Sequence, residues 1–109
     1  MKSPITTHVL DTARGVPAVG LPVALSRQVA GDWQLLGQGV TDADGRAANL
    51  LPTGHLLQAG RYRLTFGVAA YQASFFPEVV VCFEISDAGR DYHVPLLLSP
   101  FGYSTYRGS

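Results

Sequence analysis

The sequence predicts an all-β protein, a two-sheet antiparallel β-sandwich with one short helix. Three observations predict this class. About seven or eight short segments alternate apolar and polar residues, as strands with one buried face do. Turn signals rich in glycine, proline and aspartate separate those segments. The chain of 109 residues is 47% hydrophobic and 15% charged, which suits one core and a single domain over residues 1–109 and excludes a disordered chain.

The N-terminal part of the chain contains three strand-like segments separated by turns. They are residues 5–11 (ITTHVLD), 21–29 (LPVALSRQV) and 33–40 (WQLLGQGV). In the first of them, Ile5 and Val9 share one face, and His8 lies on the opposite face. The stretch TDADGR, residues 41–46, has the Asp-Gly composition of a tight turn.

The C-terminal part continues the same pattern. Its strand-like segments are residues 61–68 (RYRLTFGV), 79–85 (VVVCFEI) and 92–100 (YHVPLLLSP). The first alternates most clearly, with Tyr62, Leu64 and Phe66 on the face predicted to be inside. Residues 69–75 lack that alternation and could form two helical turns. Residues 49–60 have no clear period and are predicted to form a loop.

Charge and hydropathy exclude several classes of partner. Lysine plus arginine and aspartate plus glutamate both number 8, and no basic cluster is present, so a nucleic-acid or anionic-membrane partner is not expected. Near-zero net charge favours self-association. No apolar stretch approaches the roughly 20 residues that span a membrane, and the start MKSPITTHV lacks a signal-peptide core. We therefore expect a soluble protein of a reducing compartment, most simply the cytoplasm.

The single cysteine, Cys82, excludes an internal disulfide and a multi-cysteine zinc site. Because it lies within an apolar run, we interpret it as a small buried hydrophobic residue rather than a reactive thiol. His8 and His93 with one unpaired cysteine are too few ligands for zinc. No metal site is therefore predicted.

Two of the three histidines lie on the less apolar faces of predicted strands. Each of them, His8 and His93, taken alone is more often a surface or hydrogen-bonded polar residue. Together they raise the prospect of a shared pocket, because histidine is the side chain best suited to move protons near neutral pH. His55 lies in the predicted loop, and nothing around it assigns a role.

The stretch TDADGR resembles the opening of an EF-hand loop, but Thr53 stands where the loop needs an acidic residue. A turn is therefore the better interpretation, and it would hold Arg46 firmly at its end. An exposed arginine is usually only solvated. Beside two histidines, however, Arg46 could bind a small, flat, anionic or carbonyl-rich molecule, since its guanidinium matches paired oxygens. The serine-hydrolase motif G-x-S-x-G is absent, and Ser104 has the wrong spacing.

Four motifs, THVLD, DADGR, YHVPLLLSP and the terminal YRGS, together resemble the 5-hydroxyisourate hydrolase family, also called transthyretin-related proteins. The resemblance covers essentially the whole chain, and YRGS is its most specific part. It implies a transthyretin-like fold of two four-stranded sheets, and a homotetramer with sites at subunit interfaces. It also implies an activity without metal or organic cofactor. Water opens a ring of 5-hydroxyisourate, an intermediate of urate breakdown, to give 2-oxo-4-hydroxy-4-carboxy-5-ureidoimidazoline.

The resemblance also implies site residues, motif by motif. The catalytic set is His8, Arg46, His93 and Ser109, and the substrate-binding set is His8, Arg46, Tyr106, Arg107, Gly108 and Ser109. The terminal segment is expected to line a pocket at a subunit boundary, with Gly108 letting the backbone bend close to a ligand. Either His8 or His93 could be the general base.

Two other classes of function stay open at this point. A transthyretin-like protein can be a carrier of small hydrophobic molecules, and fold alone does not distinguish a carrier from an enzyme. A carrier has no need for paired histidines or for an arginine near the chain end. A purely structural sandwich domain would tolerate trimming of the last four residues with little change beyond stability.

Overall fold

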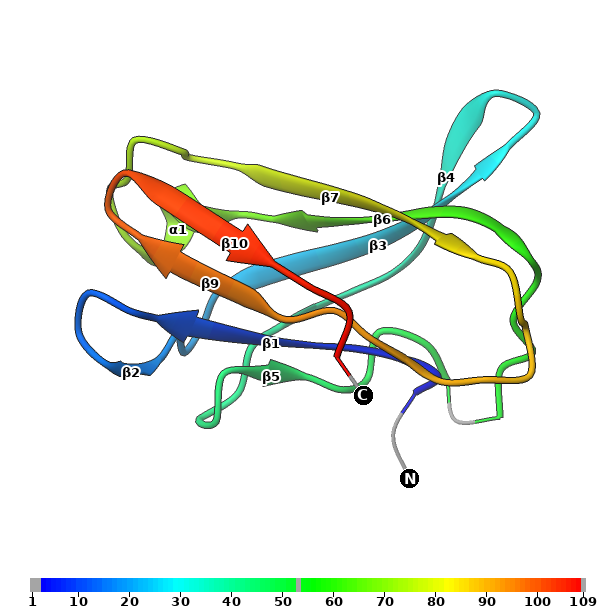
Figure 1. Cartoon of the computed structure of the whole chain (residues 1–109), viewed down its shortest axis with the longest axis horizontal. Helices are drawn as coiled ribbons and strands as arrows, with labels where there is room; N and C mark the ends of the chain where they lie inside the picture. The colour runs from blue at the N-terminus through cyan, green and yellow to red at the C-terminus, as the bar shows by residue number, and fades with distance from the viewer. Residues whose placement is uncertain (1–2, 53, 109) are drawn as a thin grey trace.

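Two β-sheets pack face to face in the computed structural model, which describes residues 3–52 and 54–108 (Figure 1). The first sheet is built around β1 (Ile5–Asp11). Its other strands are β2 (Val16–Pro17), β5 (Arg46–Ala47), β8 (Tyr92–His93), β9 (Leu96–Ser99) and β10 (Gly102–Thr105). Their order is β10-β9-β1-β2, and β5 and β8 also pair with β1. The strand β1 therefore pairs with four other strands and organises this sheet.

The second sheet runs in the order β4-β3-β6-β7. Its strands are β3 (Pro22–Val29), β4 (Asp32–Val40), β6 (Gly60–Phe66) and β7 (Val79–Ile85), each antiparallel to its neighbours. A short helix, α1 (Val68–Tyr71), follows β6, and a long loop joins β5 to β6. The predicted sandwich with one short helix is confirmed.

Alternation within the strands builds the core between the sheets. On β6, Tyr62, Leu64 and Phe66 are almost completely buried, as their pattern predicts. On β1, Ile5 and Val9 are fully buried in the same cluster. Burial of a side chain of this size contributes about 1.5–3 kcal/mol. Because neighbouring residues of a strand point to opposite faces, the other face of β1 is the outer face of its sheet.

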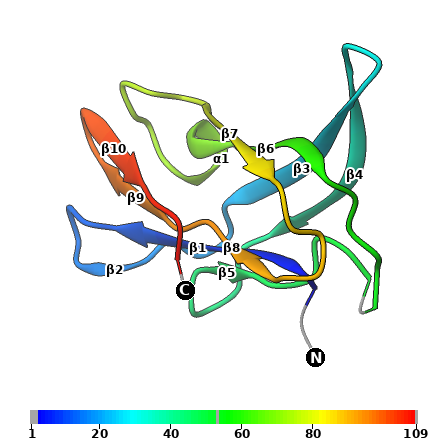
Figure 2. The same cartoon turned by 45° about the vertical axis from the view of Figure 1, so that its right-hand side comes forward.

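The prediction of antiparallel pairing is wrong at one place. The strand β1 runs parallel to β8 and to β9, with Thr6 opposite His93 and Val9 opposite Leu96. A tight hairpin forces antiparallel pairing, but β1 and β9 are connected through the whole second sheet, so no turn constrains their direction. The parallel register sets β8 beside β1, and the bridge between His93 and Gly108 brings the end of the described chain beside β8 (Figure 2).

Two predicted elements are shorter than their patterns indicated. The segment 92–100 is divided into β8 and β9, because Pro95 has no backbone N–H to give to a ladder. The helix ends at Tyr71, since Gln72 is already extended, with φ −164° and ψ 161°.

No helix among the described residues combines the length and apolarity that a membrane span requires.

The interpretation of Cys82 as a buried hydrophobic residue is wrong, because its thiol side chain is exposed. The strand β7 buries Val79 and Ile85 at its two ends, and the period of two places Cys82 on the opposite face. An apolar run such as VVVCFEI does not reveal which alternate residues face outward. The strand is also an edge of its sheet.

Candidate active site

The turn before β5 holds Arg46 through hydrogen bonds to one carboxylate. Oδ1 of Asp42 accepts the backbone N–H of Asp44 at 2.9 Å and that of Arg46 at 3.0 Å. These two hydrogen bonds lower the pKa of Asp42 below its ordinary value, and the bond from Arg46 has the larger effect. Gly45 completes the turn with φ +77°, and a Cβ there would lie 2.5 Å from the carbonyl oxygen of Val9. The turn interpretation of this stretch is confirmed.

Arg46 lies directly opposite His8 in the antiparallel pair of β1 and β5. Residues directly opposite one another share a face of the sheet, with Cβ atoms about 4.5–5.5 Å apart. Nε2 of His8 lies 2.8 Å from the carbonyl oxygen of Asp44. A carbonyl oxygen only accepts, so Nε2 carries the proton. Nδ1 of the neutral ring is therefore the atom that can take a proton.

His93 joins the same face through the parallel pair of β1 and β8. It lies opposite Thr6, and its Nδ1 is 2.8 Å from Oγ1 of Thr6. Thr6 and His8 are two residues apart on β1 and share a face. The structure thus places His8 of β1, Arg46 of β5 and His93 of β8 on one outer face. Figure 2 shows β5 and β8 beside β1.

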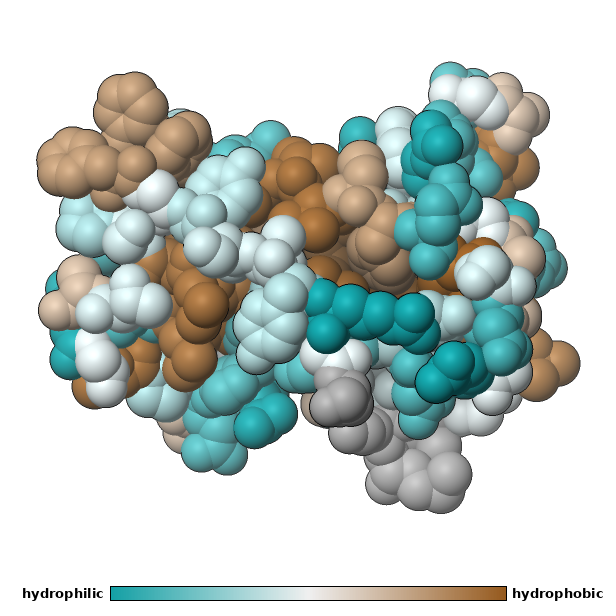
Figure 3. All heavy atoms as spheres, viewed as in Figure 1, coloured by the Kyte–Doolittle hydropathy of each residue, from teal (hydrophilic) through white to brown (hydrophobic). Residues whose placement is uncertain are grey.

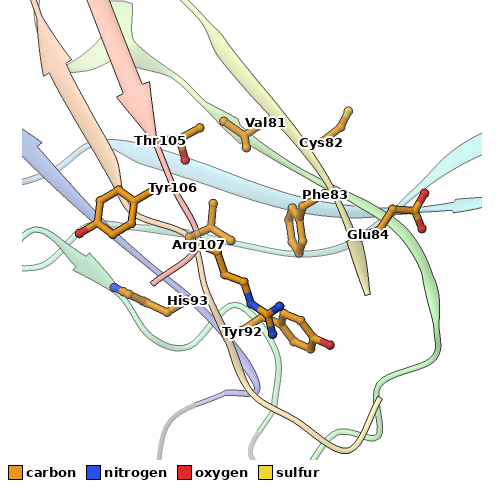
Figure 4. Close-up of a pocket in the computed structure, with 10 residues that line it drawn as sticks. Val81, Cys82, Phe83, Glu84, Tyr92, His93, Thr105, Tyr106 and Arg107 are labelled. Atoms are coloured by element: carbon orange, nitrogen blue, oxygen red, sulfur yellow. The ribbon is translucent and has the colours of Figure 1, made fainter. Parts of the chain in front are cut away.

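The segment after β10 lies against His93. The backbone N–H of Gly108 donates to the carbonyl oxygen of His93 at 2.8 Å, and a Cβ at Gly108 would lie 2.6 Å from Cδ2 of the ring. Gly108 therefore approaches His93 closely, whereas the approach to a ligand stays a prediction. The guanidinium of Arg107 lies 5.0 Å from the ring centroid of Tyr92, and the Tyr106 side chain is 58% exposed (Figure 4). The predicted role of Ser109 falls outside the described residues.

A hollow of about 240 Å³ lies between β7, β8 and this terminal segment (Figure 4). Residues that line it include Val81, Phe83, Val94, His93, Tyr106 and Arg107. The space-filling view shows apolar side chains gathered in the central hollow of this side of the molecule, with hydrophilic side chains along its lower rim (Figure 3). A flat ring with polar edges would match such a surface.

Arg46 lines a different hollow, also of about 240 Å³, together with Asp42 and Asn49. One chain therefore brings His93, Tyr106 and Arg107 to one hollow and Arg46 to another. His55 lines two further hollows, and neither contains His8, Arg46 or His93 or a residue of the segment 106–108. No group of three or more histidine, cysteine, aspartate or glutamate residues within 3–52 and 54–108 could hold a metal ion.

Sequence reasoning missed the residues that hold the predicted ones. Thr6 forms a hydrogen bond with the ring of His93, and Asp42 accepts one from the backbone of Arg46. The ring of Tyr92 lies against the guanidinium of Arg107. The spacing of Thr6 and His8 along β1 was a usable signal, because it places both on one face. The contact between Thr6 and His93 was not foreseeable, because it depends on the parallel register of β1 and β8.

The fold and this face define an all-β sandwich protein that presents histidine and arginine groups on the outside of one sheet. A profile of the HIUase/Transthyretin family matches residues 5–108. The 5-hydroxyisourate hydrolase of Mus musculus is 48% identical over 114 residues, which span 98% of this chain and 96% of that protein. The chain belongs to the HIUase/Transthyretin family, as its motifs indicated.

Two solved structures show how closely the fold is shared within the family. The structure of Klebsiella pneumoniae 5-hydroxyisourate hydrolase is 38% identical, with a TM-score of 0.83 over 96% of this chain and 97% of that one. Sea bream transthyretin, crystallised in complex with thyroxine, is 34% identical, with a TM-score of 0.88 over 97% of this chain and 95% of that one. The higher TM-score belongs to the protein of lower identity. Backbone similarity alone therefore does not separate the hydrolase from the transthyretin.

Proposed function

We propose that this chain is a 5-hydroxyisourate hydrolase, acting in urate breakdown, whose reaction takes place at the outer face of β1, β5 and β8. The observation that carries the proposal is the placement of His8, Arg46 and His93 on that one face. It occurs in a chain that matches a 5-hydroxyisourate hydrolase over 98% of its length. A hydrolase of this kind needs proton transfer and charge stabilisation at one place, which are what imidazole and guanidinium groups supply.

The reaction is the hydrolysis of a cyclic amide. The oxygen of water bonds to the ring carbonyl carbon, and a base takes the proton that the water loses. The ring C–N bond then breaks, the nitrogen receives a proton, and a carboxylate and an open ureido chain result. Positioned proton transfer of this type contributes about 10²–10⁴-fold in rate.

We assign the base to His8. The hydrogen bond from its Nε2 to the carbonyl of Asp44 leaves Nδ1 of the neutral ring as the proton acceptor. Arg46, directly opposite His8, stabilises the oxyanion that forms on the attacked carbonyl. One such donor is worth on the order of 3 kcal/mol. Arg107 and Tyr106, with Ser109, orient the ring of the substrate.

A second copy of the chain completes the site in this proposal. The hollows that contain Arg46 and His93 are separate within one chain, and a subunit packed on the outer face of β1 would enclose both. We therefore propose a homotetramer with sites at subunit interfaces. Sedimentation tests this: active protein should sediment as a tetramer, whereas full activity in a particle of one 11.6 kDa chain would contradict it.

We also propose a cytoplasmic location, which the exposed thiol of Cys82 supports, because free thiols persist in reducing compartments. Cell fractionation with a specific antibody tests it. Recovery of the protein in a secreted or periplasmic fraction would contradict it.

The carrier is the second candidate, favoured only by the high TM-score of the sea bream transthyretin. One assay separates the two functions. Freshly generated 5-hydroxyisourate is mixed with the purified protein, and its ultraviolet absorbance is followed against the spontaneous decay. Acceleration proportional to protein concentration is expected. Decay at the spontaneous rate, with protein shown to be folded, would refute the hydrolase.

A further inference from the structure

We propose that Thr6 is a positioning residue, whose hydroxyl donates a hydrogen bond to Nδ1 of His93 and so holds the neutral ring with its proton on Nε2. The role in hydrolysis rests on the proposed function above. The hydrogen bond and the tautomer rest on the structure. The two parts can therefore fail separately in the experiments described below.

The hydrogen bond between Thr6 and His93 has ordinary length and is partly buried. Oγ1 and Nδ1 are 2.8 Å apart, which is an ordinary hydrogen-bond length. Thr6 is 7% exposed, so bulk water competes little for its hydroxyl. The parallel register sets the two residues opposite each other, and the N–H of Val94 donates to the carbonyl of Thr6 at 3.0 Å.

The direction of this hydrogen bond follows from what a hydroxyl needs. If Nδ1 donated to Oγ1, the hydroxyl proton of Thr6 would need another acceptor. No other side-chain hydrogen bond of Thr6 is found within residues 3–52 and 54–108. A sheltered donor without an acceptor is costly. The hydroxyl therefore donates to Nδ1, and the proton of the neutral ring lies on Nε2.

The backbone and Gly108 hold His93 in the position where Thr6 meets it. Gly108 donates to the carbonyl of His93 at 2.8 Å, and its missing side chain leaves room for the ring edge at Cδ2. The ring is thus bounded by a hydrogen bond at Nδ1 and by backbone beside Cδ2. Such double restraint selects both the tautomer and the orientation of an imidazole.

The two histidines of the face then have complementary proton states. His8 presents Nδ1 as an acceptor, and His93 presents a proton on Nε2. Within the proposed reaction, His8 takes the proton of the attacking water, and His93 gives its Nε2 proton to the departing ring nitrogen. Thr6 touches neither water nor substrate in this scheme, and it acts through His93.

Nitrogen NMR tests the tautomer without any assay of activity. The full-length protein is labelled with ¹⁵N-histidine and studied well above the ordinary histidine pKa of about 6.5. With 3 histidines in the chain, the His93→Asn variant identifies the signals of His93 by their loss. We expect a pyridine-like Nδ1 and a pyrrole-like Nε2. A pyrrole-like Nδ1 in the wild-type protein would overturn the proposal.

Substitutions at Thr6 test its role in turnover. Thr6→Val removes the hydroxyl and keeps the branched shape, whereas Thr6→Ser keeps the hydroxyl. We expect Thr6→Val to give a mixture of His93 tautomers and a kcat about 10- to 100-fold lower, with KM changed less than about threefold. Thr6→Ser should keep the tautomer and restore most of kcat. Equal kcat values for Thr6→Val and Thr6→Ser would contradict the positioning role.

Thr7 offers a matched control on the same strand. Its hydroxyl donates to the carbonyl of Val94 at 2.5 Å, but it lies on the core face of β1. Thr7→Val should lower the melting temperature and leave the His93 tautomer and kcat almost unchanged. If Thr7→Val shifted the tautomer as much as Thr6→Val did, general loosening of β1 would explain both and the proposal would fail. Wild-type protein with the expected tautomer but no hydrolysis would refute the proposed function alone.

Discussion

Replacing Gly108 by alanine should disable the proposed site while leaving the fold intact. The added Cβ would lie 2.6 Å from Cδ2 of His93 and 3.3 Å from its Cγ and its carbonyl oxygen. Carbon atoms in contact normally lie about 3.5–4.0 Å apart, so the ring or the terminal segment must move by about 1 Å. Gly108 belongs to an isolated bridge outside the named strands, so this movement costs the core little.

A displacement of about 1 Å in a reacting group costs on the order of 10²-fold in rate. We therefore expect Gly108→Ala to lower kcat for 5-hydroxyisourate by about that factor, and to change the melting temperature by no more than a few degrees. The assay is the ultraviolet decay of freshly made substrate, with differential scanning fluorimetry on the same samples.

Gly102→Ala is the matched control for this substitution. Gly102 lies at the start of β10, and a Cβ there would make an ordinary 3.5 Å contact with Oγ of Ser99. Its kcat should stay within about threefold of the wild type. If Gly108→Ala retained wild-type kcat, the close approach of the terminal segment to His93 would have no part in catalysis, and the reasoning would be refuted.

Three further predictions concern the arginine, the turn and the core. Arg46→Lys keeps the positive charge but loses the planar guanidinium with its paired N–H donors, so kcat should fall by about tenfold or more. A kcat equal to that of the wild type would show that Arg46 does not stabilise the oxyanion. Asp42 has a pKa below its unfolded value of 3.8, so its contribution to stability is present above that pH and is lost as pH falls through the folded pKa. Thermal melts should accordingly show a smaller acid loss for Asp42→Asn than for the wild type, and parallel curves would contradict this. The hydroxyl of Tyr71 donates to the carboxylate of Asp11 at 2.8 Å, and Asp11 is only 1% exposed. Tyr71→Phe should therefore lower the free energy of unfolding, measured by urea titration, by about 1.5–3 kcal/mol. An unchanged unfolding midpoint would show that this hydrogen bond contributes nothing.

Local patterns predicted most of the strands. Alternation located β1 at residues 5–11, and a bounded apolar run located β7 at residues 79–85, both with the bounds that the structure has. The composition of TDADGR predicted the turn that holds Arg46. These features depend on a few adjacent residues, because side-chain period and turn chemistry are local properties.

Long-range features were beyond the same reasoning. The exposure of Cys82 depends on which face of an apolar strand meets the core. The bond between Thr6 and His93 depends on a parallel register between residues far apart in the chain. The resemblance to a family supplied the candidate residues, but the geometry that relates them came from the pairing of β5 and β8 with β1.

The central claim is that His93 serves turnover rather than stability, on the face that it shares with His8 and Arg46. The most direct test compares the rates at which His93→Asn and His55→Asn proteins consume 5-hydroxyisourate, because the hollows that His55 lines contain neither His8, Arg46 nor His93. We predict a loss of about 10²-fold or more for His93→Asn, near-wild-type turnover for His55→Asn, and similar melting temperatures for both. Undiminished turnover by a folded His93→Asn protein would contradict the account.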